Sequence, residues 1–288
     1  MRGRAVARPG VLAVLNASPD SFSGNRVDPG DAADLAVRMV EDGADVLDVG
    51  AQSLRTDQPE ISVHDELERL LPVLSAVADR VGDTVDLSVD TYRHQVADAA
   101  LRTGASIVND PSGLIDPELA DLVAGTHASI VVAFNPGVPK HRRPAELRME
   151  DPADACRRFL TDRIDVLHRA GVRIDQVILD PGPDLYKAPD ETVAVLRAVP
   201  TLRAELGVDR VLWALSRKDF VGVLTGRVPR ERGAGTLGAL AALDLQDRDL
   251  LRVHDVAATV NFLTVRAALL HGTHGPLEMD DAIRYDPR

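Results

Sequence analysis

Residues 11–23 read VLAVLNASPDSFS, and the change of character at Asn16 indicates how the chain folds. Residues 11–15 are all apolar, which is typical of a strand buried on both faces of a parallel sheet. The chain then turns at once into small polar residues and a proline: Asn16, Ser18, Pro19, Asp20, Ser21 and Ser23. We therefore expect a core strand whose carboxyl end faces a bound ligand.

The same apolar run recurs along the chain at 45–49, 85–89, 106–108, 129–134, 176–179, 210–215 and 250–253. Segments of helical period separate these runs, at 31–41, 64–80, 92–102, 117–124, 151–170, 190–206, 235–245 and 256–271. Eight strand–helix units in a chain of 288 residues match the size of a (β/α)8 barrel, which has about 250 residues. The prediction is an α/β fold, a single TIM barrel domain over residues 1–288.

The rival fold is a doubly wound open sheet. It would place a glycine-rich phosphate turn after the first strand, and the sequence NASPDS at 16–21 is no such turn. We find no linker and no second domain. Residues 136–144 (PGVPKHRRP) form the longest irregular insert, and we expect a mobile or edge loop there.

Composition excludes several classes of protein. The net charge of −12 argues against a nucleic-acid partner. No apolar run approaches the ~18 residues of a membrane span, and the basic start of the chain lacks a following apolar signal segment. The single cysteine, Cys156, excludes an intramolecular disulfide framework. We expect a cytoplasmic protein with small-molecule substrates and no membrane contact.

The eight strands end in polar side chains, and the carboxyl ends of barrel strands converge on one mouth. In chain order these are Asn16, Asp48, Asp90, Asn109, Asn135, Asp180, residues 216–218, and Arg252 with His254. A single such Asp is usually a helix cap or a turn former. Asp110 and Asp255 are expected caps, and Asp48 is expected to support neighbouring backbone. Glu66, Glu68 and Arg69 are expected on a solvated helix face. It is the complete set of strand ends that indicates a site.

The expected site has two chemical halves. Asp90, Asn109, Asp180 and Lys218 suit a flat heterocycle with paired N–H donors, since a carboxylate accepts two parallel hydrogen bonds. The other half gathers cations near Asn16, namely Arg55, Lys218, Arg252 and His254, as at the phosphate site of many barrels. No transition-metal motif is present, but Mg²⁺ carried by a diphosphate and touched by Asn16 would suit oxygen ligands.

The chain resembles dihydropteroate synthases. The motifs that carry the resemblance are VLNASPDSFS, GADVLDVGAQSLR, SVDTYR, GASIVND, VILDPG, ALSRKDFVG, ERGAGT and RVHDV, in the order and spacing of that family over about residues 11–270. The resemblance implies a barrel, a homodimer through helices of the later units, and folate biosynthesis. It also implies the reaction, in which 7,8-dihydropterin-6-ylmethyl diphosphate and p-aminobenzoate give dihydropteroate and pyrophosphate.

The resemblance further implies roles for individual residues. Asp90, Asn109, Asp180 and Lys218 would bind the pterin, and Asn16, Arg55, Arg252 and His254 would bind the diphosphate. Asn16 would also touch Mg²⁺. The expected catalytic residues are Lys218, Arg252 and His254. The second-substrate pocket would contain Phe22, Leu54, Thr56 and Asp219.

This sequence departs from the family pattern mainly around the second substrate. The family's Gly-Glu-Ser-Thr-Arg-Pro reads AQSLRT at 51–56, and the Ser that usually follows Ser-Arg-Lys is Asp219. An aspartate ~4–5 Å from a substrate carboxylate would cost about 3–4 kcal/mol at an effective dielectric of ~20. The family's Ile-Gly-Phe-Gly-Lys reads PDLYK at 183–187, and the Met-His that usually ends the fifth strand reads Phe134-Asn135.

These departures leave alternatives open. The chain could be a divergent paralogue that binds the pterin diphosphate but uses another nucleophile, or one that is not a functional synthase. A methyltetrahydrofolate–corrinoid methyltransferase shares the pterin pocket but has no diphosphate to hold, which RVHDV and Ser-Arg-Lys disfavour. A non-catalytic pterin-binding module would bind the diphosphate without releasing pyrophosphate.

Overall fold

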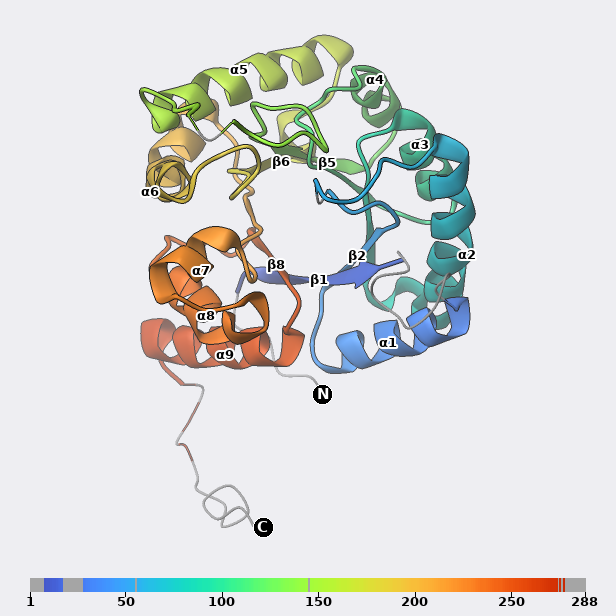
Figure 1. Ribbon diagram of the computed structural model, residues 1–288. Helices are drawn as coiled ribbons and strands as arrows, with labels where there is room; N and C mark the ends of the chain where they lie inside the picture. The colour runs from blue at the N-terminus through green and yellow to red at the C-terminus, as the bar shows by residue number, and fades with distance from the viewer. Residues whose placement is uncertain are drawn as a thin grey trace.

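Eight parallel strands form one sheet that curls into a barrel (Figure 1). The computed structural model describes residues 8–17, 28–54, 56–144, 146–273, 275 and 277. The strands are β1 (Gly10–Asn16), β2 (Val46–Gly50), β3 (Asp86–Asp90), β4 (Ile107–Asp110), β5 (Ser129–Ala133), β6 (Val177–Asp180), β7 (Leu212–Trp213) and β8 (Leu250–Val253). They neighbour one another in the order β6-β5-β4-β3-β2-β1-β8-β7.

The barrel closes between β6 and β7. Leu179 and Val211 form a parallel bridge, and the backbone N–H of Leu179 donates to the carbonyl of Arg210 at 3.0 Å. These contacts join the two end strands of the sheet into a nearly closed barrel, so the doubly wound alternative is wrong and the predicted TIM barrel is confirmed. Each expected apolar run overlaps an observed strand.

Helices surround the barrel (Figure 1). The described α-helices are α1 (Pro29–Glu41), α2 (Val63–Val81), α3 (His94–Arg102), α4 (Glu118–Ala124), α5 (Pro152–Ala170), α6 (Pro189–Leu206), α7 (Asp219–Thr225), α8 (Gly233–Ala241) and α9 (Val256–His271). The short α7 lies between β7 and the expected 235–245 segment, outside the eight helical segments that pair with strands. No described helix combines the length and apolar character needed to cross a membrane.

The barrel interior is filled in layers, and this determines where the site lies. The layer nearer the amino ends of the strands is apolar and consists of Leu12, Val46, Ile107, Val131, Ile178, Leu212 and Leu250. Because side chains alternate along a strand, Asp48 points to the same interior as Val46, one layer nearer the mouth. In register with Asp48 lies Ser88 on β3, which is also fully buried. The interior therefore changes from apolar to polar along the barrel axis.

Candidate active site at the barrel mouth

Asp48 joins side chains from three other strands. Its Oδ1 accepts a hydrogen bond from Ser88 Oγ at 2.6 Å. Its Oδ2 accepts from Asn109 Nδ2 at 3.0 Å and from Arg252 Nε at 2.7 Å. The expectation that Asp48 supports neighbouring backbone is wrong, since all three of these bonds join it to side chains. A fully buried carboxylate with this set of donors fixes the orientation of Asn109 and Arg252 together.

Arg252 bridges two carboxylates. Its Nη2 donates to Asp90 Oδ2 at 2.6 Å while Nε is held by Asp48. Although burial opposes it, the neighbouring Asp48 and Asp90 carboxylates raise the pKa of Arg252, so this group stays charged. Burial raises the pKa of Asp90, and Arg252 acts against that rise. The structure therefore brings the expected pterin residues Asp90 and Asn109 into contact with one network that contains Arg252.

Asp180 lies at the end of β6, almost fully buried. Its Oδ1 accepts a hydrogen bond from the backbone N–H of Gly182 at 2.7 Å. Burial raises its pKa, and the cations Lys218, Lys187 and Arg252 act in the opposite direction. The Lys218 cation also lowers the pKa of Asp90. Asp90, Asp180, Lys218 and Arg252 thus share one electrostatic neighbourhood, as the strand-end pattern predicts.

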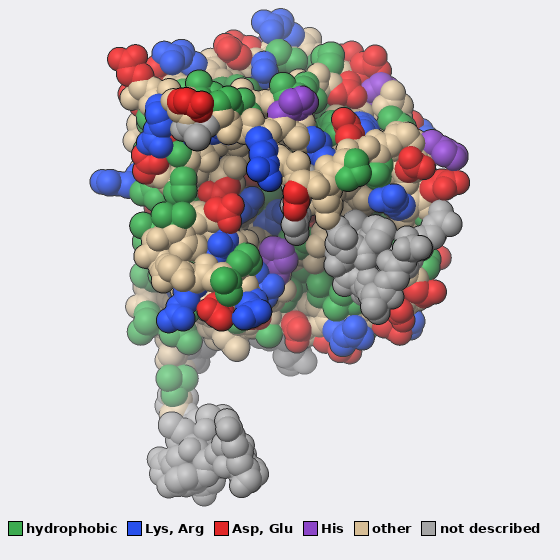
Figure 2. All heavy atoms as spheres, viewed as in Figure 1, with side chains coloured by type: hydrophobic (Ala, Val, Ile, Leu, Met, Phe, Trp, Pro, Cys, Tyr) green, Lys and Arg blue, Asp and Glu red, His purple; other side chains and the backbone are tan. Residues whose placement is uncertain are grey.

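Ser216 and His254 connect the ends of β7 and β8. The Ser216 Oγ accepts from the backbone N–H of His254 at 3.3 Å and lies 2.9 Å from His254 Nδ1. Desolvation, together with the cations Arg252 and Arg217, lowers the pKa of His254 to about 4, so the ring is neutral at pH 7. Figure 2 shows a hollow near the centre of the viewed face, with Lys, Arg and His side chains in and around it.

Three expected residues belong to the early loops. Asn16 ends β1 with an exposed side chain and is paired in register with Gly50 of β2. Gly50 allows a close approach there, because a Cβ on it would lie 3.1 Å from the Cβ of Asp90. Arg55 and Phe22 lie outside the described residues.

Leu54 and Thr56 line a small hollow of about 80 Å³ beside the mouth. The other walls come from the segments after β5 and β6 and include Lys140, His141, Leu185 and Tyr186. Lys140 donates from Nζ to the carbonyl of Ser53 at 2.6 Å, so the irregular 136–144 segment is tied to the loop after β2. Tyr186 packs on Gly137, where a Cβ would lie 2.1 Å from its ring.

Asp219 is not among the residues that line this hollow. It is the first residue of α7, and its side chain is 78% exposed. Its Oδ1 accepts from Nη1 of Arg232 at 2.8 Å.

Comparison with known proteins agrees with this geometry. The sequence profile of the family described as pterin binding enzyme matches residues 12–254. A dihydropteroate synthase of Bacillus subtilis is 36% identical over 270 residues, which cover 92% of this chain and 90% of the relative. Among solved structures, a Xanthomonas albilineans dihydropteroate synthase with 4-aminobenzoic acid is 37% identical, with a TM-score of 0.83 over 92% of this chain and 94% of that one. The chain belongs to the dihydropteroate synthase family.

A second solved dihydropteroate synthase, from Anaplasma phagocytophilum with bound 6-hydroxymethylpterin-monophosphate, is 29% identical. Its TM-score is 0.80 over 91% of this chain and 99% of that one. The chain is therefore a dihydropteroate synthase-type transferase, and folate biosynthesis fits it. No finding favours the alternatives of another nucleophile, a corrinoid methyltransferase or a non-catalytic module.

One departure from the dihydropteroate synthase pattern has a clear structural basis. Asp184 and Tyr186 stand where the family has glycines, and both adopt positive φ, of 64° and 53°. The backbone therefore keeps a conformation that glycine adopts without strain. Lys187, which matches the family's Lys, is buried, and its Nζ donates to the carbonyls of Phe134 and Leu185.

Sequence reasoning missed some contributing residues. Glu66 is buried and pairs with Arg93 at 2.7 Å, so the expectation of a solvated position is wrong. Its signal was its place on the apolar side of α2 next to Leu70. Arg232 lies inside the ERGAGT motif but had no assigned role. Nothing in the sequence around Asp184 indicated that its side chain accepts hydrogen bonds from the start of α7. The expected cap Asp255 is confirmed, since its Oδ1 accepts from the backbone N–H of Ala258 in α9. The expectation of a cap at Asp110 is wrong, because its carboxylate accepts from the N–H groups of Ser112 and Leu114 in the turn after β4, whereas α4 begins later, at Glu118.

Proposed function

We propose that the barrel mouth condenses 7,8-dihydropterin-6-ylmethyl diphosphate with p-aminobenzoate and releases pyrophosphate. The observation that carries this proposal is the network on Asp48, which presents Asn109, Arg252 and Asp90 together at the open end of the barrel. These groups match the two halves of the substrate, a ring with N–H donors and an anionic diphosphate.

The pterin ring would be held by Asp90, Asn109, Asp180 and Lys218. Asp180 is a buried carboxylate, and a carboxylate can accept the paired N–H groups of the pterin's amidine-like edge. Asn109 is fixed by Asp48, so its side-chain oxygen is left to face away from that carboxylate as an acceptor for the ring. Lys218 would complete this set, since its charge lowers the pKa of both Asp90 and Asp180.

The diphosphate would bind towards Arg252 and His254, with Asn16 also on this side. Arg55, to which the family resemblance assigns the same role, stays in the proposal. When the C–O bond breaks, its electron pair leaves with pyrophosphate and a pterin-methyl cation remains. The amine nitrogen then attacks this cation, and the new C–N bond forms as the nitrogen loses a proton. Arg252 is a permanent cation, and the low pKa of His254 leaves its ring neutral in the free protein. Both side chains can donate hydrogen bonds to the diphosphate. Preorganised donors of this kind stabilise the charge that develops on a leaving group.

Mg²⁺ is proposed as the accompanying metal. The described residues hold no group of three His, Cys, Asp or Glu that could form a metal site. The side-chain oxygen of Asn16 suits an ion that keeps several waters and is bound chiefly through substrate phosphates. When bound, Mg²⁺ would neutralise part of the charge of the diphosphate.

The second substrate would enter between the loops after β2, β5 and β6, where Leu54 and Thr56 meet Leu185 and Tyr186. Their apolar surfaces suit an aromatic ring. Phe22 and Asp219, which the family resemblance assigns to the second-substrate pocket, stay in the proposal. An arylamine is already nucleophilic, so no strong general base is needed.

The test is a direct assay. Purified protein with the pterin diphosphate and Mg²⁺ should release pyrophosphate when p-aminobenzoate is added, and dihydropteroate should appear in equal amount. Aniline and 4-aminobenzamide, which lack the carboxylate, serve as comparison amines. Tight binding of the pterin diphosphate with no pyrophosphate release under any amine would contradict the proposal and favour a binding module.

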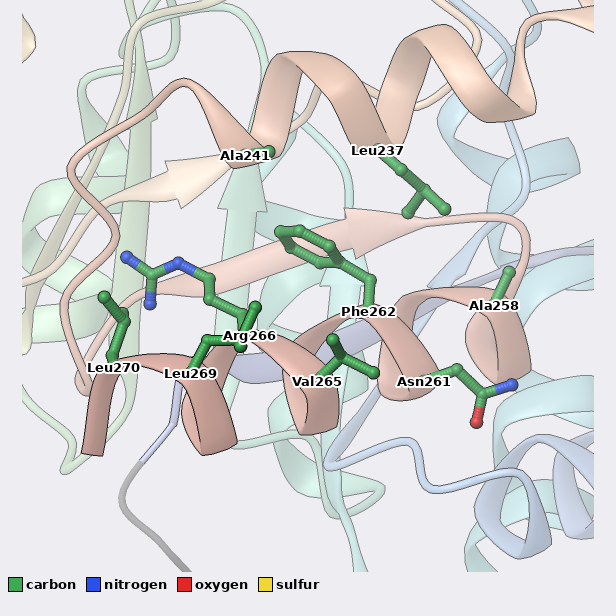
Figure 3. Close-up of a pocket in the computed structure, with 9 residues that line it drawn as sticks. All are labelled: Leu237, Ala241, Ala258, Asn261, Phe262, Val265, Arg266, Leu269 and Leu270. Carbon is green, nitrogen blue, oxygen red and sulfur yellow. The ribbon is translucent and has the colours of Figure 1, made fainter. Parts of the chain in front are cut away.

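A homodimer is proposed through α8 and α9. Figure 3 shows Leu237 and Ala241 of α8 beside Phe262, Val265 and Leu269 of α9. The hollow between them has a volume of about 750 Å³. The side chains of Val265 and Leu269 are 59% and 82% exposed. Exposed apolar side chains that gather in one patch are typical of an interface between proteins. The proposed occupant is the same face of a second copy.

Sedimentation tests the dimer. Val265→Glu with Leu269→Glu should shift the protein to monomer, whereas Ile174→Glu, at an exposed apolar position away from this face, should not. A wild-type protein that sediments as a monomer at micromolar concentration would contradict the proposed dimer.

We further propose that residues 1–288 form a single domain and act in the cytoplasm, where the buried thiol of Cys156 stays reduced.

A further inference from the structure

The turn that carries Lys218 has an unusual conformation. Arg217 has a φ of 59°, in the left-handed region that residues other than glycine rarely adopt. Lys218 stands at the N-cap position of α7, where its own side chain makes no capping hydrogen bond within the described structure. A strained turn followed by an uncapped helix would be poorly fixed unless other parts of the chain held it.

Asp184, from the loop after β6, supplies the missing cap. Its Oδ2 accepts a hydrogen bond from the backbone N–H of Asp219, and its Oδ1 lies 3.4 Å from the N–H of Phe220. These are the first two N–H groups of α7. The cap thus comes from a residue 35 positions earlier in the chain.

Thr192 in turn holds Asp184 in place. The backbone N–H of Asp184 donates to Thr192 Oγ1 at 3.1 Å, and that hydroxyl lies 3.4 Å from Asp184 Oδ1. Thr192 is fully buried in α6. Asp184 is therefore attached to the rigid helix layer on one side and to the Lys218 turn on the other.

The same loop begins at Asp180. Asp180 fixes the backbone of Gly182 through its Oδ1, and Asp184 follows two residues later with a positive φ. Burial raises the pKa of Asp184, while the nearby Lys218 cation opposes this rise. The loop thus connects one proposed pterin ligand, Asp180, to another, Lys218.

We propose that Asp184 is a positioning residue that sets the place of Lys218 over the pterin. This inference rests on the proposed function. Asp184 acts through the backbone of α7 rather than by touching the substrate, and aspartate tolerates the left-handed conformation that the loop requires there. The expected effect is on the pterin ring, because the charge of Lys218 lowers the pKa of both Asp90 and Asp180, which are proposed to bind that ring.

The experiment is a double-mutant cycle with 6-hydroxymethylpterin as the probe in calorimetry. Asp184→Gly suits the positive φ but removes the cap, and it should weaken pterin binding about tenfold. In a Lys218→Ala background the same change should alter binding by less than about twofold, since coupled residues are not additive. Asp184→Asn, which keeps an acceptor oxygen, should recover much of the affinity.

Hydrogen exchange supplies the second measurement and does not depend on ligand. In Asp184→Gly the amides of 219–223 should exchange about tenfold faster. Asp151→Gly is the matched control, because Asp151 caps α5 through two backbone N–H groups in the same way and α5 carries no proposed ligand. It should leave both pterin affinity and exchange at 219–223 unchanged.

The outcomes separate the two proposals. Unchanged exchange at 219–223 in Asp184→Gly, or effects of Asp184→Gly and Lys218→Ala that simply add, would overturn the positioning role. A wild-type protein that binds no pterin at all would overturn the proposed function instead, and exchange would still report whether Asp184 holds the turn.

Discussion

Asp219 and Arg232 form an ion pair at the start of α7, with Oδ1 and Nη1 2.8 Å apart. The same guanidinium donates to the carbonyls of Arg217 and Arg227 and covers Gly222, where a Cβ would lie 2.3 Å from Nη2. Asp219 is therefore partly neutralised and well solvated. The repulsion calculated for an unpaired aspartate against a substrate carboxylate should be much reduced.

Asp219→Ser should consequently change the KM for p-aminobenzoate by less than about tenfold. An unpaired carboxylate at ~4–5 Å would instead predict a change of more than a hundredfold. Steady-state kinetics with p-aminobenzoate and with aniline measures this, since aniline lacks the group that would be repelled. A hundredfold gain confined to p-aminobenzoate would show that Asp219 faces the substrate.

Asp180→Asn should keep the fold and lose the carboxylate that is proposed to accept two pterin N–H groups. Truncation of such a charge-assisted pair costs about 2–5 kcal/mol. Calorimetry with 6-hydroxymethylpterin checks the loss of affinity, and thermal unfolding checks the fold. Unchanged affinity would remove Asp180 from the site.

Asp48→Asn should destabilise the protein strongly, because Arg252 would lose one of its two carboxylates in a largely buried position. Breaking a buried pair costs about 3–5 kcal/mol in the free energy of unfolding. Asp98→Asn is the control. Asp98 pairs with Arg102 on the surface of α3, and its loss should cost below about 1 kcal/mol. Urea titration of both variants measures the difference, and equal costs would contradict the central role of Asp48.

His254→Ala should weaken the binding of pyrophosphate with Mg²⁺ and leave that of 6-hydroxymethylpterin nearly unchanged. Arg252→Ala should weaken both, because Arg252 also holds Asp90. Since His254 has a pKa of about 4, the pH profile of kcat/KM between pH 5.5 and 8 should be parallel in wild type and His254→Gln. A wild-type ionisation near pH 6.5 that disappears in the variant would contradict a neutral ring.

Lys187 predicts a pH dependence of stability. Burial lowers its pKa to about 7, although Cys156 and Asp180 oppose this. Between pH 7 and 10 the unfolded chain keeps the proton that the folded chain releases, so the free energy of unfolding should rise with pH by up to about 1.4 kcal/mol per unit. Lys187→Met should lack this rise. Urea titrations at pH 7, 8, 9 and 10 measure the free energy of unfolding of the wild type and of Lys187→Met. The same pH dependence in both proteins would contradict the lowered pKa of Lys187.

The sequence by itself determined the barrel, its eight strands and the polar ring at their ends. These features follow local rules, because burial on both faces makes a strand uniformly apolar and the carboxyl ends of parallel strands meet at one mouth. Motifs such as SVDTYR and RVHDV also indicated the family to which the chain belongs. The pattern placed Asp90, Asn109, Asp180 and Arg252 at the mouth without reference to any contact between them.

Only the tertiary structure decided which of these side chains touch. Arg252 meets Asp48 across 204 positions of sequence, and Asp184 meets the start of α7 across 35. Neither pairing leaves a local trace, since it depends on the stagger of closed strands and on the path of loops between helices. Burial of Glu66 against Arg93 has the same origin. Apolar periodicity fixes which face of an element is covered, but the partner that a buried charge finds is fixed by the packing of distant elements.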